Sequence, residues 1–528
     1  MTVDVCLRGG RVLDVFSGAA RRLDVSIAGG RIVSLSEQPA RDVVDARGAW
    51  IVPGLIDAHV HLESSHLTPA EFARAVVPRG TTRVIADPHE IANVCGLEGV
   101  RALLEASRGL PLQSGFMAPS CVPAAPFGAA PACLGPAEVA EILSWDGVLG
   151  LAEVMNVPGI LSGDEELLAK IRLARGRPID GHAPGLRGDA LARYASRGPR
   201  SDHEAPTLEE AAEKLAYGMH VLLREGSAAQ NLRALLPLLT ERSAPFVHFC
   251  TDDRSAESLV RDGHMDDIVR LAVAAGAAPD LVVAAATIHA AQAYGLSDVG
   301  AIAPGYQADL ALVPDLRTFR PRAVYAAGAL VAAEGELVVT LPEADLGMLR
   351  GCVRARDLAP SDLRIPAPRS GERAHVIGIL AGQILTDAGR VTPLVVDGAA
   401  VADPKRDLAK AAVFDCRTPR QGVGLGFVRG LGLRRGALAS TVAHDAHPLV
   451  VVGTSDEDML CAARAVLASG GGQAVAADGE VLASLPLPLA GLLSQESARG
   501  VAAREAARRG AARRRGAPRA GRVAAGAV

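Results

Sequence analysis

The chain has 528 residues, 49% of them hydrophobic, and is too long for one core. We expect about three or four domains of ~150 residues, or fewer if one is a large barrel. Its formal net charge of −4 argues against a body that binds nucleic acid. No run of about 18 uncharged apolar residues occurs, and no basic segment followed by an apolar run opens the chain, so we expect neither a membrane span nor a secretory signal peptide.

The eight cysteines are scattered along the chain and form no CxxC pair. This distribution argues against a structural zinc ribbon, and it implies no disulfide framework in a chain of this length. We therefore expect a reducing, cytoplasmic setting.

Residues 1–52 alternate apolar and polar side chains around Gly-Gly turns, which is typical of short strands. Such strands need a partner sheet, and matching segments occur far downstream, at 308–314, 322–335 and 336–341. We therefore predict that residues 1–52 and 301–345 build one small β-sandwich, with the segment between them as an insertion.

The inserted segment, residues 53–300, alternates short apolar runs with longer amphipathic stretches. The apolar runs are 54–61, 81–90, 147–156, 178–185, 199–204 and 244–253, and the amphipathic stretches include 67–80 and 207–226. Repeated strand-then-helix units of this length predict an α/β fold, a parallel sheet closed as a (β/α)8 barrel. In such barrels the loops at the carboxyl ends of the strands carry the chemistry.

Two regions follow the barrel. Residues 370–495 are strand-rich with several helical stretches, which predicts a third domain of α+β character. Residues 499–528 hold nine arginines and one glutamate among many alanines and glycines. Since this composition offers few large apolar side chains to offset the entropy of ordering, we predict a disordered tail there.

The strongest chemical signal is the sequence PGLIDAHVH at 53–61. His59 and His61 are two residues apart, so on a strand both side chains point to the same face. A lone HxH pair is as often structural as functional, but at the end of a barrel strand both imidazoles can reach one cation. The pattern therefore predicts that these two histidines nucleate a metal site.

Further candidate ligands stand at the ends of later apolar runs, each before a turn: Glu153, His182, His203 and Asp252, with Asp253 beside the last. Taken singly, each could be a capping or core-polar residue. Together they supply enough histidines and carboxylates for two divalent metals with a bridging ligand and open positions for water. Such ligands permit Zn, Fe and Mn alike.

A second polar cluster, ADPHE at 86–90, ends the next predicted barrel strand. Asp87, His89 and Glu90 could line a substrate pocket or stand in an outer shell around the metals. The alternative is an Asp-Pro turn followed by a helix N-terminus.

A third polar cluster lies in the C-terminal domain, where His444, Asp445 and His447 share one turn before a strand. Polar groups in an otherwise apolar stretch need partners or water. We predict that this domain completes the site through these residues; the alternative is a hydrogen-bonded turn within its own domain.

Several stretches resemble the bacterial adenine deaminases of the amidohydrolase superfamily. HLESSHLTP, ADPHEIANV and HDAHPLVVVG are specific to those deaminases, whereas HxH and GxxADLA occur throughout the superfamily. The resemblance covers roughly residues 1–495. It implies hydrolytic deamination of adenine to hypoxanthine and ammonia at a dinuclear Mn or Fe site, with Zn as a further possibility.

Many superfamily members bridge two metals with a carboxylated lysine. None of the lysines here ends a strand-like run of the barrel, and the resemblance implies that Glu153 takes that place. A water molecule activated by the metals would attack C6 of the purine, and a carboxylate would carry the proton to the departing amine. Asp252 is the first candidate for that carboxylate, and Asp253 and Glu204 are second choices. The predicted metal ligands are His59, His61, Glu153, His182, His203 and Asp252.

Two other functions stay open. A cyclic-amide hydrolase of the dihydroorotase or hydantoinase type uses the same kind of metal site but opens a ring and releases no ammonia. A non-catalytic scaffold should have lost metal ligands, whereas all the expected types are present. The predicted partners are adenine and further copies of the chain in a homo-oligomer, with no nucleic acid and no membrane.

The predicted tail begins where the resemblance stops, near Ser494. A frameshift that replaced the natural C-terminus is our preferred interpretation, and a basic tail that binds anionic partners is the alternative. In either case we expect the tail to contribute nothing to chemistry.

Overall fold

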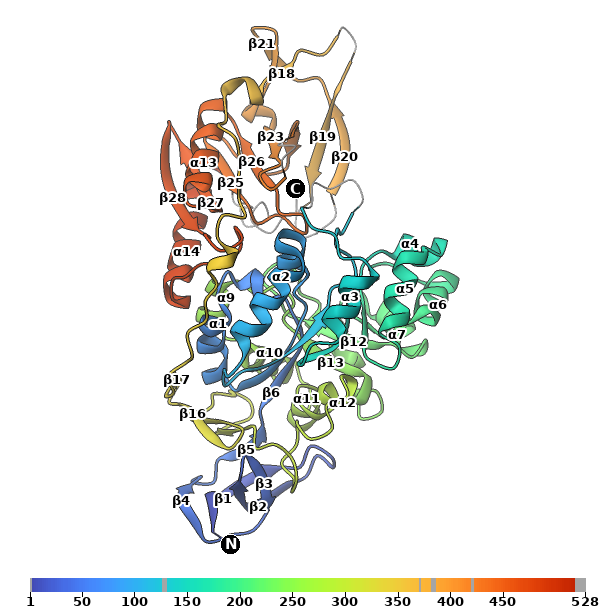
Figure 1. Cartoon of the computed structure of the whole chain (residues 1–528), viewed down its shortest axis with the longest axis vertical. Coiled ribbons are helices and arrows are strands. Elements are labelled where there is room, and N and C mark those ends of the chain that lie inside the picture. Colours follow the sequence, from blue (N-terminus) through green and yellow to red (C-terminus); the bar gives the residue numbers. More distant parts are fainter. Residues whose placement is uncertain (1, 126–130, 370–371, 381–385, 419–421, 518–528) are drawn as a thin grey trace.

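Figure 1 shows three stacked parts, with a barrel between a small N-terminal sheet and a C-terminal domain. The structure is a computed structural model, and it describes residues 2–125, 131–369, 372–380, 386–418 and 422–517. The predicted α/β class, a (β/α)8 barrel with additional sheet domains, is confirmed. In the described part of the chain no helix has the length and apolar character needed to cross a bilayer.

The barrel contains eight parallel strands in chain order, in one sheet of five and one of three. Every residue of β6 and of β13 is buried, as expected for strands with helices on one face and a packed interior on the other. The strands are β6 (Leu55–Val60), β7 (Thr81–Ala86), β8 (Gln113–Ala118), β9 (Val148–Val154), β10 (Ile179–Gly181), β11 (Ser201–Asp202), β12 (His220–Arg224) and β13 (Val247–Cys250).

Two seams close the ring of strands. At one, Arg200 N, just before β11, donates a hydrogen bond of 2.9 Å to the Ile179 carbonyl in β10. At the other, Asp252 N donates to His59 O at 3.0 Å, and His61 N donates to Asp252 O at 3.1 Å. The second seam therefore joins the end of the first strand to a residue just beyond the last strand.

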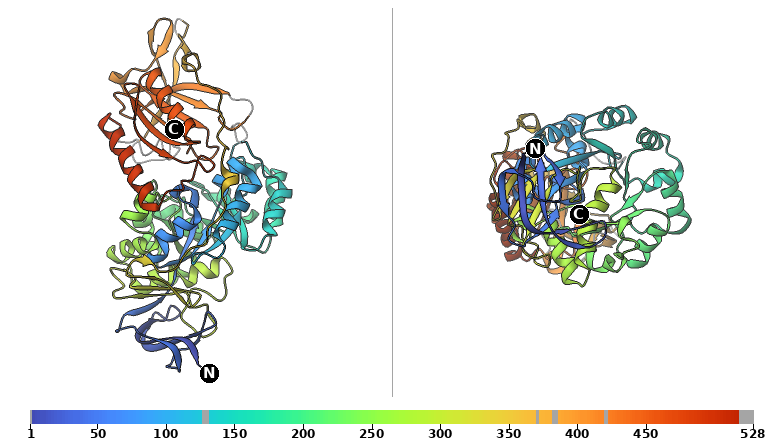
Figure 2. Two further views of the ribbon diagram at one scale, coloured as in Figure 1. Left: turned by 60° about the vertical axis from the view of Figure 1, so that its left-hand side comes forward. Right: turned by 90° about the horizontal axis from the view of Figure 1, so that it is seen from below.

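Helices form the outer ring of the barrel, which is clearest in the view from below in Figure 2. They begin at local signals: α1, for example, has Thr68 as its N-cap, which accepts a bond from Glu71 N, and a proline at its first position. The helices are α1 (Pro69–Val76), α2 (His89–Ser107), α3 (Pro136–Leu143), α4 (Val157–Ser162), α5 (Glu165–Leu173), α6 (Gly188–Arg197), α7 (Leu208–Ala216), α8 (Leu232–Leu235), α9 (Ala256–Arg261), α10 (Met265–Ala274), α11 (Pro279–Ala285) and α12 (Ile288–Ala293).

The amphipathic stretch 207–226 is not one helix, so that sequence interpretation was wrong. Gly218, with a φ of 76°, lies between the end of α7 and the start of β12. The apolar run at 221–223 then enters the barrel as a buried strand. A fully buried strand has no alternation of apolar and polar residues, so periodicity alone does not separate it from a helix.

The segments that flank the barrel meet in one nine-stranded sheet. β14 pairs antiparallel with β5, with Leu310 opposite Pro53, so the chain leaves this sheet for the barrel and returns to it beside its exit point. The strands are β1 (Val3–Leu13), β2 (Ala20–Ala28), β3 (Arg31–Ser34), β4 (Ala40–Asp45), β5 (Trp50–Pro53), β14 (Leu310–Val313), β15 (Ala323–Ala326), β16 (Ala329–Ala333) and β17 (Glu336–Leu337).

The C-terminal domain is built on an eight-stranded sheet with the order β20-β19-β24-β23-β26-β25-β27-β28. Helix α13 (Asp456–Ala468) packs on it, and Met459 and Leu460 share a core with Leu449 and Val451 of β26. The remaining bounds are β18 (Ile365–Pro366), β19 (Ala374–Ile379), β20 (Thr386–Val391), β21 (Leu394–Val396), β22 (Ala399–Val401), β23 (Leu408–Phe414), β24 (Val423–Arg429), β25 (Ala437–Ser440), β26 (Leu449–Gly453), β27 (Gly472–Ala477) and β28 (Glu480–Pro486).

The predicted disordered tail is wrong for most of its length, because the chain forms helix α14 (Ala498–Arg514) there. The helix lies against α9 of the barrel and β28 of the C-terminal domain (Figure 1). Val501 and Ala502 join the barrel core, and Ala511 and Ala512 join a core of the C-terminal sheet. Small side chains allow this close packing. The tertiary contacts therefore offset the entropy cost of ordering the segment, which its composition alone could not offset. Residues 518–528 of the predicted tail lie outside the described residues.

We predict that Val501→Asp lowers the melting temperature by several degrees. Val501 is fully buried, and the substitution removes about 1.5–3 kcal/mol of apolar burial and also buries an unpaired charge. Ala503→Asp changes an exposed position two residues further along the same helix and is the matched control. Equal melting curves for the two variants, followed by circular dichroism, would show that α14 does not dock.

The docking of α14 should also depend on pH through Glu505. Burial raises the pKa of this carboxyl from 4.5 to about 8, although Arg508 and a backbone N–H act in the opposite direction. A raised pKa in the folded chain means that stability is complete at low pH and is lost as pH rises from about 4.5 to about 8. Glu505→Gln should therefore melt like the wild type below pH 4.5 and at a higher temperature than the wild type above pH 8. Glu241→Gln, at an exposed carboxylate, is the control.

Candidate metal centre

The first two candidate ligands project from the end of β6. His59 lies in the strand, His61 directly follows it, and both are buried. Their Nε2 atoms lie 3.5 and 3.1 Å from Oδ1 of Asp252. The two-residue spacing gives both imidazoles the same face, and the closure of the barrel brings Asp252 opposite them.

Glu153, near the carboxyl end of β9, occupies the centre of the cluster. Its Oε1 lies 3.5 Å from His61 Nε2, and its Oε2 lies 2.6 Å from His182 Nδ1 and 3.5 Å from His203 Nε2. Burial raises the pKa of Glu153, but the surrounding imidazoles outweigh burial and hold it well below its ordinary value. A carboxylate whose two oxygens face different histidines can bridge two cations.

His182 and His203 follow β10 and β11, and hydrogen bonds to the barrel fix both loops. The buried hydroxyl of Tyr194 accepts a bond from His182 N and donates one to Val154 O. Asn231 Nδ2 donates to the His203 carbonyl at 3.1 Å. These bonds hold the backbone of both histidines, whose rings face Glu153.

The donor atoms fit divalent cations. Metal–ligand bonds of 2.0–2.2 Å place neighbouring donors about 3.0–3.5 Å apart, and most donor distances around His59, His61 and Glu153 are 3.1–3.5 Å. The donors of His59, His203 and Asp252 form one group that could hold an ion, and those of Glu153, His182 and His203 form another. His59 Nε2 is buried and has no hydrogen-bond partner among the described residues, as expected of an atom that binds a cation.

Asp87 and His89 lie against the ligand cluster. His89 Nδ1 lies 3.2 Å from Asp87 Oδ2 and 3.5 Å from Glu153 Oε1. The Asp87 carbonyl lies 3.0 Å from His61 Nδ1, so a proton there leaves Nε2 of His61 for a metal. Together with His61 and Glu153, these two residues form a group that could itself hold a cation.

Arg224, the last residue of β12, is a site residue that the sequence reasoning missed. Its buried guanidinium pairs with both oxygens of Glu204, and its Nη1 lies 2.5 Å from Oδ2 of Asp252. The available signal was an arginine at the end of a buried apolar run, close to where the candidate ligands stand in theirs. It was missed because that stretch was interpreted as a helix.

Asp252 is held both electrostatically and by its backbone. Burial raises the pKa of its carboxyl, but Arg224 and then His59 and His61 outweigh burial and hold it well below its ordinary value. Its φ of 55° lies in the left-handed region, which costs energy for a residue with a Cβ. The closure of the barrel enforces this conformation.

The other two candidate proton carriers have competing partners. Burial raises the pKa of Glu204, but His203 and Arg224 bring it to about 2. The carboxylate of Asp253 accepts a hydrogen bond from Ser64, although it also lies within reach of His61. Of the three carboxylates, Asp252 is the one that contacts the imidazoles of both His59 and His61 and also lies beside the side chains around Glu153.

The C-terminal domain reaches this cluster through the buried carboxylate of Glu90, in the first turn of α2. His444 Nδ1 lies 2.5 Å from Glu90 Oε1, and His447 pairs with the other oxygen. His447 Nδ1 accepts a backbone N–H, so its Nε2 carries the proton that it donates to Glu90. Asp445 Oδ1 lies 3.5 Å from His89 Nε2. All three side chains of this turn thus have partners in the barrel.

Comparisons with known proteins match this architecture. Residues 50–331 match the model of the amidohydrolase family, and residues 383–523 match that of the adenine deaminase C-terminal domain. An adenine deaminase of Nitratidesulfovibrio vulgaris is 48% identical over 95% of this chain and 87% of its own length. Adenine deaminase 2 of Carboxydothermus hydrogenoformans is 45% identical over 94% and 86%, and the adenine deaminase of Cereibacter sphaeroides is 46% identical over 93% and 86%.

A (β/α)8 barrel with histidines and carboxylates at the carboxyl ends of its strands defines the class as that of the amidohydrolases. Through its relatives and its C-terminal domain, the chain belongs to the adenine deaminase family within that class. The C-terminal match runs to residue 523, so the expectation that the resemblance ends near Ser494 was wrong. The frameshift interpretation of the tail depended on that expectation and is therefore no longer supported.

We predict that Arg224→Met lowers metal affinity or turnover about 10–100-fold, the usual cost of losing a partner of a metal ligand. The reason is that Asp252 and Glu204 lose the guanidinium group that orients their carboxylates. Metal content by mass spectrometry and turnover at saturating metal measure the two effects. Arg254→Met removes another buried arginine, which pairs with Asp267 at 2.5 Å, and should change neither quantity.

Proposed function

We propose that the chain hydrolyses adenine to hypoxanthine and ammonia. The observation that carries the proposal is the contact between the two matched regions: His444, Asp445 and His447 of the region similar to the adenine deaminase C-terminal domain meet Glu90 and His89 at the metal cluster. A cyclic-amide hydrolase would need only the barrel ligands. The relatives named adenine deaminase support the same substrate.

We propose two divalent metal ions per chain, Mn or Fe in preference to Zn. His59, His61 and Asp252 would supply one set of donors and His182 the other, with His203 and Glu153 within reach of both. When bound, the ions supply Lewis acidity and lower the pKa of a coordinated water. The orphaned nitrogen of His59 and the centrally placed carboxylate of Glu153 support this assignment.

Asp252 is our candidate for the proton carrier. It accepts a proton from the attacking water and delivers it to the exocyclic amine, so that a C6–O bond forms while the C6–N bond breaks and ammonia leaves. Arg224 fixes one oxygen of Asp252 at 2.5 Å, which leaves Oδ1 directed at the two imidazoles and the reacting centre. Glu204 and Asp253 remain the second choices.

Asp87, His89 and Glu90 are proposed to line the adenine pocket together with His444, Asp445 and His447. Glu90 lies between two histidines of the C-terminal domain, so any movement of that domain changes the edge of the pocket. A pocket closed on two sides leaves little room for a ribose. We therefore propose that the free base is preferred over the nucleoside.

A cytoplasmic setting and a homo-oligomer complete the proposal. Exposed apolar side chains on β19, β21, β23 and β24 support contact with further copies of the chain: Ile377, Leu394, Val395, Val396, Val413 and Leu425.

We predict that the purified protein, loaded with Mn, releases ammonia from adenine and far more slowly from adenosine, guanine or cytosine. An enzyme-coupled ammonia assay, with hypoxanthine identified by chromatography, measures the reaction. Comparable turnover of adenosine would refute the pocket argument. Ring opening of dihydroorotate or a hydantoin without ammonia would identify the cyclic-amide alternative instead.

We predict that His59→Ala, Glu153→Ala and Asp252→Asn each reduce the bound metal below two ions per chain and abolish ammonia release, because each removes a donor that no neighbour replaces. Metal analysis after gel filtration measures the stoichiometry. His375→Ala, at an exposed position on β19, is the control. A metal-free wild type with full activity would contradict the proposed centre.

A further inference from the structure

Two cysteines far apart in the sequence meet where the barrel joins the C-terminal half. The Sγ atoms of Cys95 and Cys352 lie 3.1 Å apart, and both residues are free thiols. Cys95 belongs to α2, the helix that begins with His89 and Glu90. Cys352 lies in the segment that leads from the N-terminal sheet to the C-terminal domain. The contact thus joins a helix of the candidate site to the connection between two domains.

The backbone holds each thiol in place. Cys95 directly precedes Gly96, whose φ of 59° and ψ of −146° kink α2. On the other side, Leu349 O accepts a bond of 2.6 Å from Ala490 N, and Arg354 N donates a bond of 2.6 Å to Cys416 O. Cys352 is therefore anchored to the C-terminal domain on both sides of its own position.

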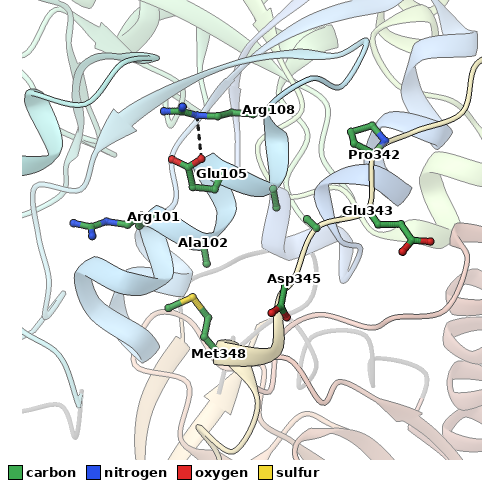
Figure 3. Close-up of a pocket in the computed structure, with 10 residues that line it drawn as sticks. Arg101, Ala102, Glu105, Arg108, Pro342, Glu343, Asp345 and Met348 are labelled. Carbon is green, nitrogen blue, oxygen red and sulfur yellow. Dashed lines mark ion pairs between the residues drawn. The ribbon is translucent and has the colours of Figure 1, made fainter.

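Neither sulfur lies in a close-packed core, because both cysteines are only half-buried. The two segments that carry the thiols also border a surface pocket of about 370 Å³ between α2 and residues 342–348. Figure 3 shows Ala102 and Glu105 on one side of this pocket and Asp345 and Met348 on the other. A disulfide has an S–S bond of about 2.05 Å, so the sulfurs must approach by roughly 1 Å from their separation of 3.1 Å. Two half-buried side chains can absorb that shift more easily than side chains in a close-packed core.

One of the thiols has the electrostatic surroundings of a reactive cysteine. The hydrogen bond from Cys95 lowers the pKa of Cys352 to about 7 against the effect of burial, and Arg417 and Arg354 act in the same direction. Arg417 also donates from Nη1 to the Ala490 carbonyl at 3.0 Å, and its buried Nη2 has no hydrogen-bond partner among the described residues. A thiolate at Cys352 is thus placed near an arginine that is otherwise incompletely paired.

We propose that Cys95 and Cys352 form a redox pair, which a hydroperoxide oxidises to a disulfide that ties α2 of the barrel to the C-terminal half. The thiolate of Cys352 attacks the peroxide; an S–O bond forms, the O–O bond breaks, and the leaving oxygen takes up a proton. The thiol of Cys95 then attacks the sulfenic sulfur, the S–O bond breaks, and the oxygen leaves as water. With hydrogen peroxide, two thiols and one peroxide give one disulfide and two waters. The proposal rests on the thiol geometry and is independent of the proposed function.

The test uses the full-length protein, treated with hydrogen peroxide in slight excess and then denatured in N-ethylmaleimide. The intact mass should show two fewer N-ethylmaleimide adducts than the reduced protein carries. Peptide mapping without reduction should show one cross-linked peptide that contains Cys95 and Cys352 and is about 2 Da lighter than the sum of its two unalkylated peptides. Cys352→Ser should abolish that peptide, whereas Cys461→Ser, at another partly buried cysteine, should retain it. Full alkylation of both residues in the oxidised wild type, or a cross-link to a different cysteine, would overturn the proposal whether or not the variants fold.

A second measurement reports the effect on the fold. A cross-link between residues 95 and 352 closes a long loop, so the oxidised wild type should melt at least about 5 °C higher than the reduced protein. Dithiothreitol should reverse the shift, and Cys352→Ser should show none. An identical melting temperature for oxidised and reduced wild type, with the cross-linked peptide present, would show that the disulfide does not lock the two regions together.

Discussion

The backbone pairing between the end of β6 and the residues after β13 is the constraint on which the candidate site depends. Two hydrogen bonds join Asp252 to His59 and His61 and close the barrel. The same bonds place Asp252, which lies nearly two hundred residues further along the chain, against the two imidazoles. The closure also holds Asp252 at a positive φ. The hydrogen bonds that close the barrel therefore also set the geometry of this candidate ligand.

Around this seam the site is a network of buried charges that stabilise one another. Glu153 faces imidazoles on both sides, and Arg224 pairs with Asp252 and Glu204. Buried charges are costly unless each is paired, so removing one partner leaves another uncompensated. This explains why the ends of so many strands carry polar residues in an otherwise apolar barrel. These mutual contacts hold the candidate ligands in position within the barrel.

The C-terminal domain is coupled to the barrel by contacts of different kinds. Glu90 pairs with His444 and His447 beside the candidate ligand cluster, α14 packs on both the barrel and the C-terminal domain, and Cys352 meets Cys95 at their junction. The three contacts are a buried ion pair, apolar packing and a pair of thiols. A domain attached in this way cannot move independently of the edge of the candidate pocket.

Features that arise from local periodicity and from motifs could be predicted from the amino-acid sequence. Strand-then-helix alternation predicted the barrel, and the two-residue spacing of His59 and His61 placed both rings on one face. The features that the sequence did not predict all depend on partners that are distant in the chain. Arg224 ends an apolar run that has no alternation, so the sequence did not identify that run as a strand. The low-complexity segment at 498–514 forms a helix because the barrel and the C-terminal domain cover it. The pairs Glu90–His447 and Cys95–Cys352 join residues hundreds of positions apart. No local pattern encodes such a pair, because the energy of each contact exists only after the barrel and the C-terminal sheet have folded against each other.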